Sequence, residues 1–159
     1  MHHPHSNTCA LVIDGSKHVT GAIKTHLVNS GWKCVYAAGS LKGAVDIVEN
    51  EIDSMANLSL VVASFPTDMT DEEELSSYIQ SVNQAFPKSA IIVLGDGIQK
   101  EFMAAIKAGA HSYLIRPFSF EEFDRHVRLS LQKTKHVKMA LKNYVHSDSK
   151  HHERKIDYG

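Results

Sequence analysis

Apolar and polar positions follow two patterns along the chain, which together predict five short strands alternating with five helices. Apolar runs too short for helices predict buried parallel strands, and they span residues 9–13, 33–38, 58–63, 89–94 and 111–115. Between these runs, apolar residues recur every three or four positions, as they do on one face of a helix. This alternation predicts a doubly wound, five-stranded parallel sheet with helices on both faces.

Residues that favour helix ends mark several boundaries of the predicted helices. Ser40 can cap the second helix, and Asp71 opens the third with a run of acidic residues that complements the helix dipole. Gly109 favours a helix stop before the fifth strand. Ser119 and Glu122 have the spacing of a capping box at the start of the last helix.

The candidate chemistry lies directly after the predicted strands. In a doubly wound sheet, ligands bind beyond the carboxyl ends of the strands, where the following loops meet. The residues at these places are Asp14, Gly15, Ser16, Ser64, Gly95, Asp96, Arg116 and Pro117.

The stretch from Lys107 to Phe118, KAGAHSYLIRPF, resembles the response-regulator receiver family, in which this segment typically reads K-A-G-A-x-x-Y-L-x-K-P-F. Residues 11–14 (LVID) resemble the family's first strand and its acidic end. The resemblance covers roughly residues 9–133 and implies a flavodoxin-like, receiver-like fold.

The resemblance also implies a phosphorylation site built from five groups, and this sequence keeps one of them unchanged. Asp14 stands at the first acid, but Gly15 replaces the second. Ser64 stands at the acceptor aspartate, Gly95 at the hydroxyl residue and Arg116 at the lysine. One carboxylate cannot cage Mg²⁺, which prefers several oxygen ligands, so we expect no metal, no cofactor and no catalytic residue.

Arg116 keeps the positive charge of the lysine, and we expect it to pair with Asp14 across the mouth of the site. Alternatives stay open: Asp14 can be a cap or loop acid, and Ser64 only a small turn residue without an identifiable base beside it. Asp68 and Asp96 could rescue metal binding.

Three further residues are candidates for a switch or an interface. The resemblance implies that Tyr113 is the aromatic residue that moves when receivers switch, although it can also be a static packing residue. It implies a cis peptide bond before Pro117, and it includes Phe118 in the same motif. In the family, residues equivalent to 99–108, 111–115 and 120–134 form the usual docking and dimer face.

Composition and charge refine the domain division. The chain is 43% hydrophobic and has no apolar run of membrane-spanning length, which favours the cytoplasm. Residues 1–132 carry 10 Lys and Arg against 15 Asp and Glu, whereas residues 133–159 carry 7 against 3. We predict an N-terminal tail over 1–8, a receiver-like domain over 9–133, and a helical extension with a basic, flexible tail over 134–159. Histidines cluster in both tails, where they can bind metal only adventitiously: His2, His3, His5, His151 and His152.

Two cysteines, Cys9 and Cys34, begin predicted strands, and we expect them to be buried thiols, with a disulfide framework unlikely. The favoured function is a phosphorylation-independent pseudo-receiver, not an enzyme, that contacts a protein partner or a second copy of itself. The alternatives are a phosphorelay regulator with a displaced acceptor and a weak nucleic-acid or small-ligand binder. Nucleic acid is expected to bind only through the basic tail.

Overall fold

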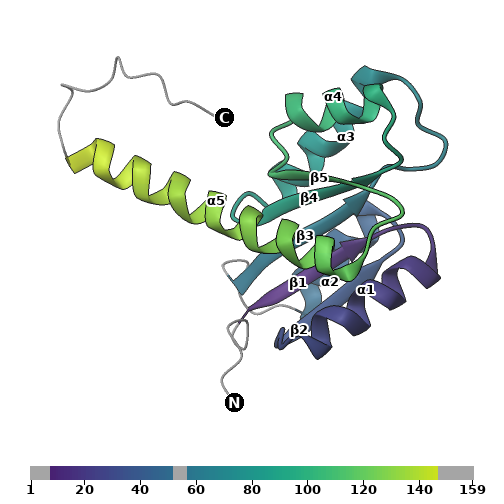
Figure 1. Ribbon diagram of the computed structural model, residues 1–159, viewed down its shortest axis with the longest axis horizontal. Helices are drawn as coiled ribbons and strands as arrows, with labels where there is room; N and C mark the ends of the chain where they lie inside the picture. Colours follow the sequence, from purple (N-terminus) through teal and green to yellow (C-terminus); the bar gives the residue numbers. More distant parts are fainter. Residues whose placement is uncertain (1–7, 52–56, 147–159) are drawn as a thin grey trace.

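A computed structural model describes residues 8–51 and 57–146, with side chains up to residue 134, and it contains one five-stranded parallel sheet (Figure 1). The strands lie in the order β2-β1-β3-β4-β5. Their bounds are β1 (Cys9–Ile13), β2 (Cys34–Ala38), β3 (Leu58–Ser64), β4 (Ala90–Gly95) and β5 (Ser112–Ile115). The predicted doubly wound fold is confirmed.

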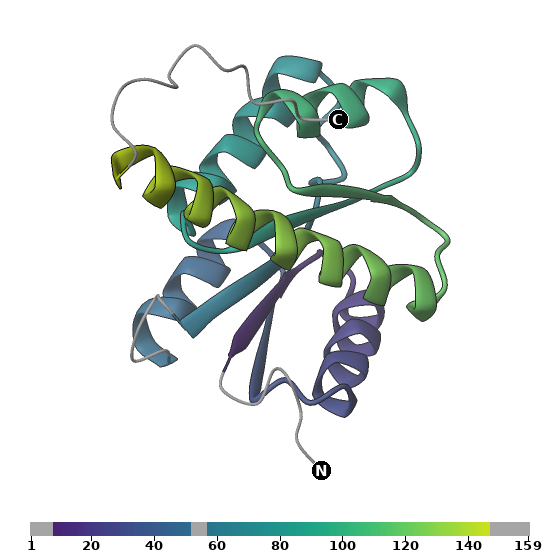
Figure 2. The same ribbon diagram turned by 60° about the vertical axis from the view of Figure 1, so that its left-hand side comes forward.

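Five helices connect or follow the strands, and they cover both faces of the sheet (Figures 1 and 2). Their bounds are α1 (Lys17–Asn29), α2 (Leu41–Glu51), α3 (Glu72–Ala85), α4 (Gln99–Lys107) and α5 (Phe120–His146). Helices α1 and α5 pack on one face, and α2, α3 and α4 pack on the other. Strand β5 is an edge strand, and α4 and α5 flank it from opposite faces of the sheet.

The two-residue period of the strands divides the core into two clusters. Leu11 and Ile13 of β1 point to the cluster under α2, α3 and α4. Ala10 and Val12 point to the cluster under α1 and α5, where Phe123 is fully buried. Burying one large apolar side chain stabilises the fold by about 1.5–3 kcal/mol, so the two clusters hold the helices on the sheet.

The predicted caps are present at the helix starts. Ser40 accepts a hydrogen bond from the Gly43 amide at 3.1 Å, and Asp71 accepts one from the Glu74 amide at 3.4 Å. The Ser119 hydroxyl accepts from the Glu122 amide at 3.1 Å. These contacts satisfy amide donors that the first turn of a helix leaves free. They fix where each helix leaves the loop that carries the site.

The expectation of two free thiols is wrong in this structure, because Cys9 and Cys34 form a disulfide. The apolar pattern predicted that both cysteines begin strands, but it does not predict the register in which the two strands pair. Cys9 lies directly opposite Cys34 in the β1–β2 ladder, with a Cα–Cα distance of 4.8 Å. Adjacent strands in this register bring the two sulfur atoms together.

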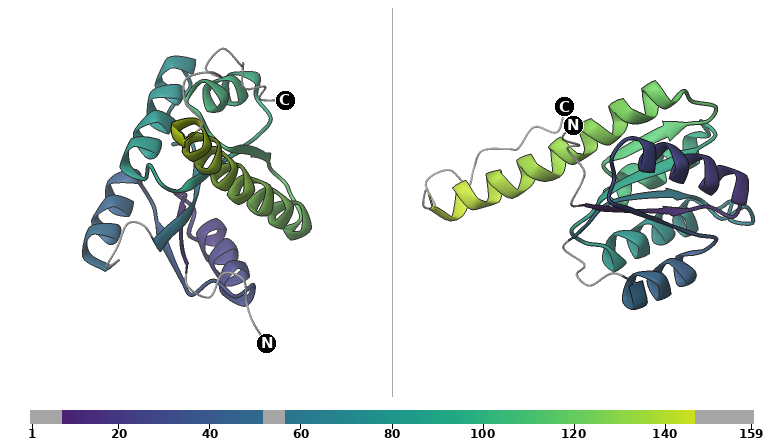
Figure 3. Two further views of the ribbon diagram at one scale, coloured as in Figure 1. Left: turned by 90° about the vertical axis from the view of Figure 1, so that its left-hand side faces the viewer. Right: turned by 90° about the horizontal axis from the view of Figure 1, so that it is seen from below.

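Helix α5 continues past the edge of the sheet to His146, which Figures 1 and 3 show as a projecting arm. The predicted extension over 134–159 is therefore helical as far as the described backbone goes. The predicted N-terminal tail, apart from Thr8, and the terminal histidines lie outside the described residues. Within the described ranges, none of the helices combines the length and apolar content needed to cross a bilayer.

Candidate functional site

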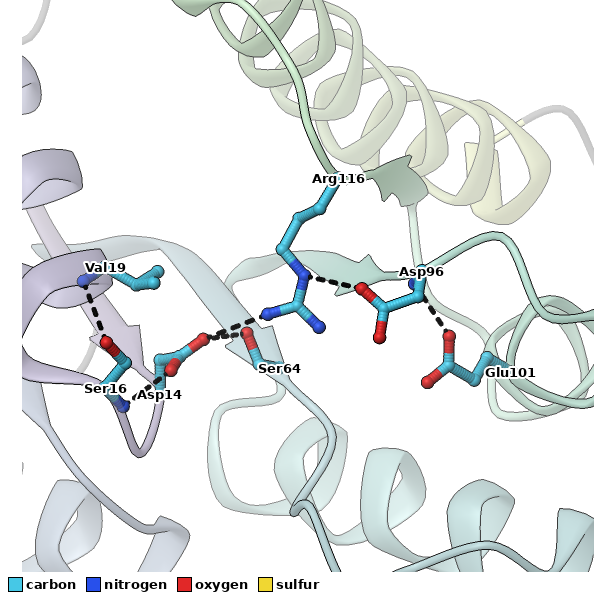
Figure 4. A network of polar contacts seen from close by, with 7 residues as sticks. All are labelled: Asp14, Ser16, Val19, Ser64, Asp96, Glu101 and Arg116. Carbon is cyan, nitrogen blue, oxygen red and sulfur yellow. Dashed lines mark hydrogen bonds and ion pairs between the residues drawn. The ribbon is translucent and has the colours of Figure 1, made fainter.

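Asp14 is the central acid of the site, at the carboxyl end of β1. Its side chain is almost fully buried, with 8% of the residue exposed. Oδ1 accepts a hydrogen bond from the Ser16 amide at 2.8 Å, and the Ser16 hydroxyl caps α1 by accepting from the Val19 amide at 3.4 Å (Figure 4). Asp14 therefore orders the turn into α1, as the loop-acid alternative proposed, and it also belongs to a polar cluster.

Ser64 stands at the end of β3, beside Asp14. Its hydroxyl donates a hydrogen bond to Oδ2 of Asp14 (Figure 4), and the residue is 5% exposed. The expectation that no base lies beside Ser64 is therefore wrong. It failed because β1 and β3 are sheet neighbours although 50 residues separate Asp14 from Ser64. Ser64 is buried, and the Asp14 oxygen that accepts from it is also paired with Arg116. Both features work against use of the Ser64 hydroxyl as a nucleophile.

Arg116 bridges two carboxylates across the mouth of the site. Its Nη1 lies 3.6 Å from Oδ2 of Asp14, and its Nε donates to Oδ1 of Asp96 at 3.2 Å (Figure 4). The predicted contact between Arg116 and Asp14 is present. The backbone holds the arginine in place, because its amide donates to the Gly95 carbonyl at 2.8 Å. The peptide bond before Pro117 is cis, as the resemblance implied.

Tyr113 occupies the space that a side chain at position 95 would need. A Cβ added to Gly95 would lie 2.5 Å from Cε1 and 2.6 Å from Cζ of the Tyr113 ring, closer than real Cβ contacts. The Tyr113 hydroxyl accepts from the Gly97 amide at 3.0 Å and donates to Oε1 of Glu101 at 3.0 Å. The ring is therefore fixed inward, between β4 and the start of α4.

Two tyrosine side chains near the site, Tyr78 and Tyr113, have raised pKa values. Burial raises the pKa of Tyr113 to about 12, and the neighbouring Glu101 and Asp96 carboxylates act in the same direction. Burial also raises the pKa of Tyr78 to about 12, with a further contribution from the negative charge of Asp14. Tyr78 and Asp14 thus share one low-dielectric region under the site.

The residues present do not fit the Mg²⁺ ion that the fold family uses. Both oxygens of Asp14 already accept hydrogen bonds, and Gly15 contributes no side chain where a second carboxylate is needed. The guanidinium of Arg116 stands where its charge repels a cation. Among the residues that the structure describes, no three His, Cys, Asp or Glu side chains cluster closely enough to hold a metal. Asp96, one of the two acids considered for rescue, is instead paired with Arg116.

The structure thus gathers the five predicted positions at one edge of the sheet, whereas Asp68 stays exposed on the loop after β3. Phe118 stacks on Phe123 at a centroid distance of 5.9 Å. Glu101 was missed. It looked like an ordinary first-turn acid, but its Oε1 accepts both the Tyr113 hydroxyl and the Asp96 amide. In the sequence, the one sign of this role was that Glu101 lies in the first turn of the helix that follows Gly95.

Comparisons with known proteins identify the fold. No family model and no curated protein matches the sequence. A receiver-domain protein (CheY-like) from Methanospirillum hungatei JF-1 is 17% identical, with a TM-score of 0.66 over 82% of this chain and 98% of that one. One from Clostridium thermocellum is 20% identical, with a TM-score of 0.64 over 82% and 98%. The beryllofluoride-activated NtrC4 receiver domain dimer is 22% identical, with a TM-score of 0.63 over 79% and 98%. The chain therefore has the flavodoxin-like fold of response-regulator receiver domains.

Proposed function

We propose that the protein is a phosphorylation-independent pseudo-receiver, a signalling module that works by contact with a protein partner or a second copy of itself. It is not expected to be an enzyme or to need a cofactor. The single observation that carries the proposal is the Arg116 bridge between Asp14 and Asp96, which fills the site with the chain's own charges.

The bridge supports a fixed state because Arg116 supplies internally the positive charge that a metal supplies in the family. The cation of Arg116 neutralises the buried Asp14 without an ion from solution. Tyr113 is held inward by two hydrogen bonds, and Gly95 leaves the room that its ring needs. A receiver of this kind would present one conformation at all times, and its output would depend on partner availability.

The surface built by α4, β5 and α5, called here the docking face, has the composition expected for such contacts. Its large apolar side chains with the greatest exposure are Ile98 at 53%, Ile106 at 54% and Ile115 at 51%. Further exposed apolar residues on the same elements are Phe102 and Met103 of α4 and Leu129 of α5, whereas the ring of Phe120 stacks on His26 of α1. Several exposed apolar side chains on neighbouring elements are in keeping with a protein interaction site. One similar structure is described as a receiver domain dimer, which is in keeping with such a role.

The proposal places the protein in the cytoplasm, where receivers meet their partners. Disulfides are rare in that reducing compartment, so the bond between Cys9 and Cys34 counts against this location.

Phosphoryl transfer is the direct test. The purified chain is incubated with acetyl phosphate and Mg²⁺, and its intact mass is measured. We expect no adduct, because the donor set does not hold the ion and Ser64 is buried. A stable phosphoryl group on the wild-type chain would contradict the proposal and favour a displaced acceptor.

A gain-of-function variant is the matched positive control. In Gly15→Asp/Ser64→Asp/Arg116→Lys, the missing acids and the lysine are restored. A Cβ at Gly15 meets nothing within 4 Å, so that position has room for the carboxylate. We expect this variant to bind Mg²⁺ and to acquire the adduct that the wild type lacks.

A further inference from the structure

A cluster of ionisable side chains lies at the start of β5, at the opposite end of this strand from the Arg116 bridge. It connects β5 with β4 and α5. It consists of His111, just before β5, and His126 and Lys133 on α5, and is called here the histidine latch. Nδ1 of His126 contacts the Ser112 hydroxyl at the start of β5. Nζ of Lys133 donates to the His111 carbonyl at 3.1 Å.

His111 also completes the ladder between β4 and β5 with its side chain. The His111 amide donates to the Ile91 carbonyl at 2.9 Å, and the Ile91 amide donates to Nδ1 of the His111 ring at 3.0 Å. A backbone N–H can only donate, so Nδ1 must be unprotonated and the ring neutral for this bond to exist. Adding a proton to the neutral ring places it on Nδ1, where it faces the Ile91 N–H. Protonation and this hydrogen bond exclude each other.

The charges around the two histidines oppose protonation from several elements. His111 meets Lys133 from α5 and the Ile91 amide from β4. His126 meets Arg125, Lys133 and the opposing carboxylate of Glu122 on its own helix, whereas β5 contributes the Ser112 hydroxyl. Burial, followed by these cations, lowers the pKa of both histidines below 6.5.

We propose that the histidine latch is an acid-sensitive switch that holds α5 and β4 on β5 at neutral pH and loosens the docking face when it is protonated. The biological meaning of this inference rests on the proposed function, because the latch would regulate the docking face. Its physical content is independent of any partner. Protonation breaks the bond between Ile91 and His111, and it gathers His111, His126 and Lys133 as three cations at the base of α5.

The sign of the pH dependence follows from the lowered pKa values. In the unfolded chain each histidine takes up a proton near pH 6.5, whereas in the folded chain it does so only at lower pH. The unfolded or opened state therefore binds more protons below pH 6.5, and acid favours it. The contribution of the latch is present above 6.5 and is lost as the pH falls through the folded-state values.

Amide hydrogen exchange on the free protein tests the latch. Protection of the Ile91 amide and of the amides at the start of β5, corrected for intrinsic exchange, is compared at about pH 7.5 and about pH 5.5, on either side of the ordinary histidine pKa. We expect protection to fall about tenfold at the lower pH. Equal protection at both values would overturn the proposal.

A neutral variant and a matched histidine control complete the experiment. In His111→Asn/His126→Asn, each side-chain oxygen can accept in place of Nδ1, and we expect the acid response to disappear. His18→Asn on α1, an exposed histidine, should leave the response unchanged. Ring resonances of the wild-type His111 and His126, followed by NMR titration, give a reading that needs no variant; titration at or above 6.5 would also overturn the proposal. These experiments use the free protein without a partner. A negative result would therefore overturn the latch and not the proposed docking role, and a failure to find docking would not overturn the latch.

Discussion

At the scale of the residue, an arginine at position 116, where a lysine could stand instead, gives the site a cation that serves two acids. A lysine ammonium is a point charge, whereas the guanidinium is a planar fork whose nitrogens point in different directions. That shape lets Nε reach Asp96 while Nη1 reaches Asp14. The buried carboxylate of Asp14 therefore has its polar partners without a metal, because its oxygens contact Arg116, Ser64 and the Ser16 amide.

Gly95 and Tyr113 form a pair in which the missing side chain of one makes room for the ring of the other. Gly95→Ala should lower the free energy of unfolding by about 1–3 kcal/mol, because the new methyl group overlaps the ring and drives Tyr113 out of its place. Urea denaturation measures the loss. The loss of the bond between the Tyr113 hydroxyl and the Gly97 amide should appear as faster exchange of that amide.

The double variant Gly95→Ala/Tyr113→Leu distinguishes steric overlap from a general intolerance of the β4 end. If overlap is the cause, the two substitutions should be non-additive, since the smaller leucine leaves space for the methyl group. Additive losses would show that Gly95 is needed for another reason, and the fixed position of Tyr113 would lose its explanation.

At the scale of the element, the sequence was a good guide wherever the signal is local. The run at 9–13 coincides with β1, and the helix predicted over 99–108 is α4 over Gln99–Lys107. Strand register and contacts between elements could not be predicted from the sequence. The disulfide depends on Cys9 facing Cys34 across two strands, and the role of Glu101 depends on how closely α4 approaches β5.

Helix α4 begins without a side-chain cap, which is unfavourable for a nine-residue helix. Its N-cap residue is Ile98, which is 53% exposed and has extended backbone angles that suit a capping serine. Ile98→Ser should raise the free energy of unfolding by about 0.5–1 kcal/mol, because its hydroxyl can accept a free amide of the first turn. Thermal and urea denaturation check this. An unchanged or lower stability would show that the Ile98 side chain contributes packing in the isolated protein, which the proposed docking role does not require.

At the scale of the whole molecule, the docking face combines an edge strand with two helices from opposite faces of the sheet. An edge strand leaves backbone groups unpaired and is a natural site for contacts, although β5 has only four residues. The apolar side chains around it come from α4, β5 and α5, while Arg116 ties the end of β5 to Asp14 and Asp96. The cluster of Asp14, Asp96 and Arg116 thus lies at one end of the short strand that runs through the docking face.

If the docking face pairs two copies of the chain, the measured mass in analytical ultracentrifugation should rise with concentration. Ile106→Ser/Ile115→Thr should shift this association to higher concentration by at least about tenfold, since two half-exposed isoleucines together bury enough apolar area to be worth more than about 1.4 kcal/mol. The free energy of unfolding should change little, because both side chains are more than half exposed in the single chain. Val28→Ser on α1, where the side chain is 48% exposed on a different element, is the matched control and should associate like the wild type. A chain that stays monomeric at every concentration, or a control that loses association equally, would contradict pairing through this face.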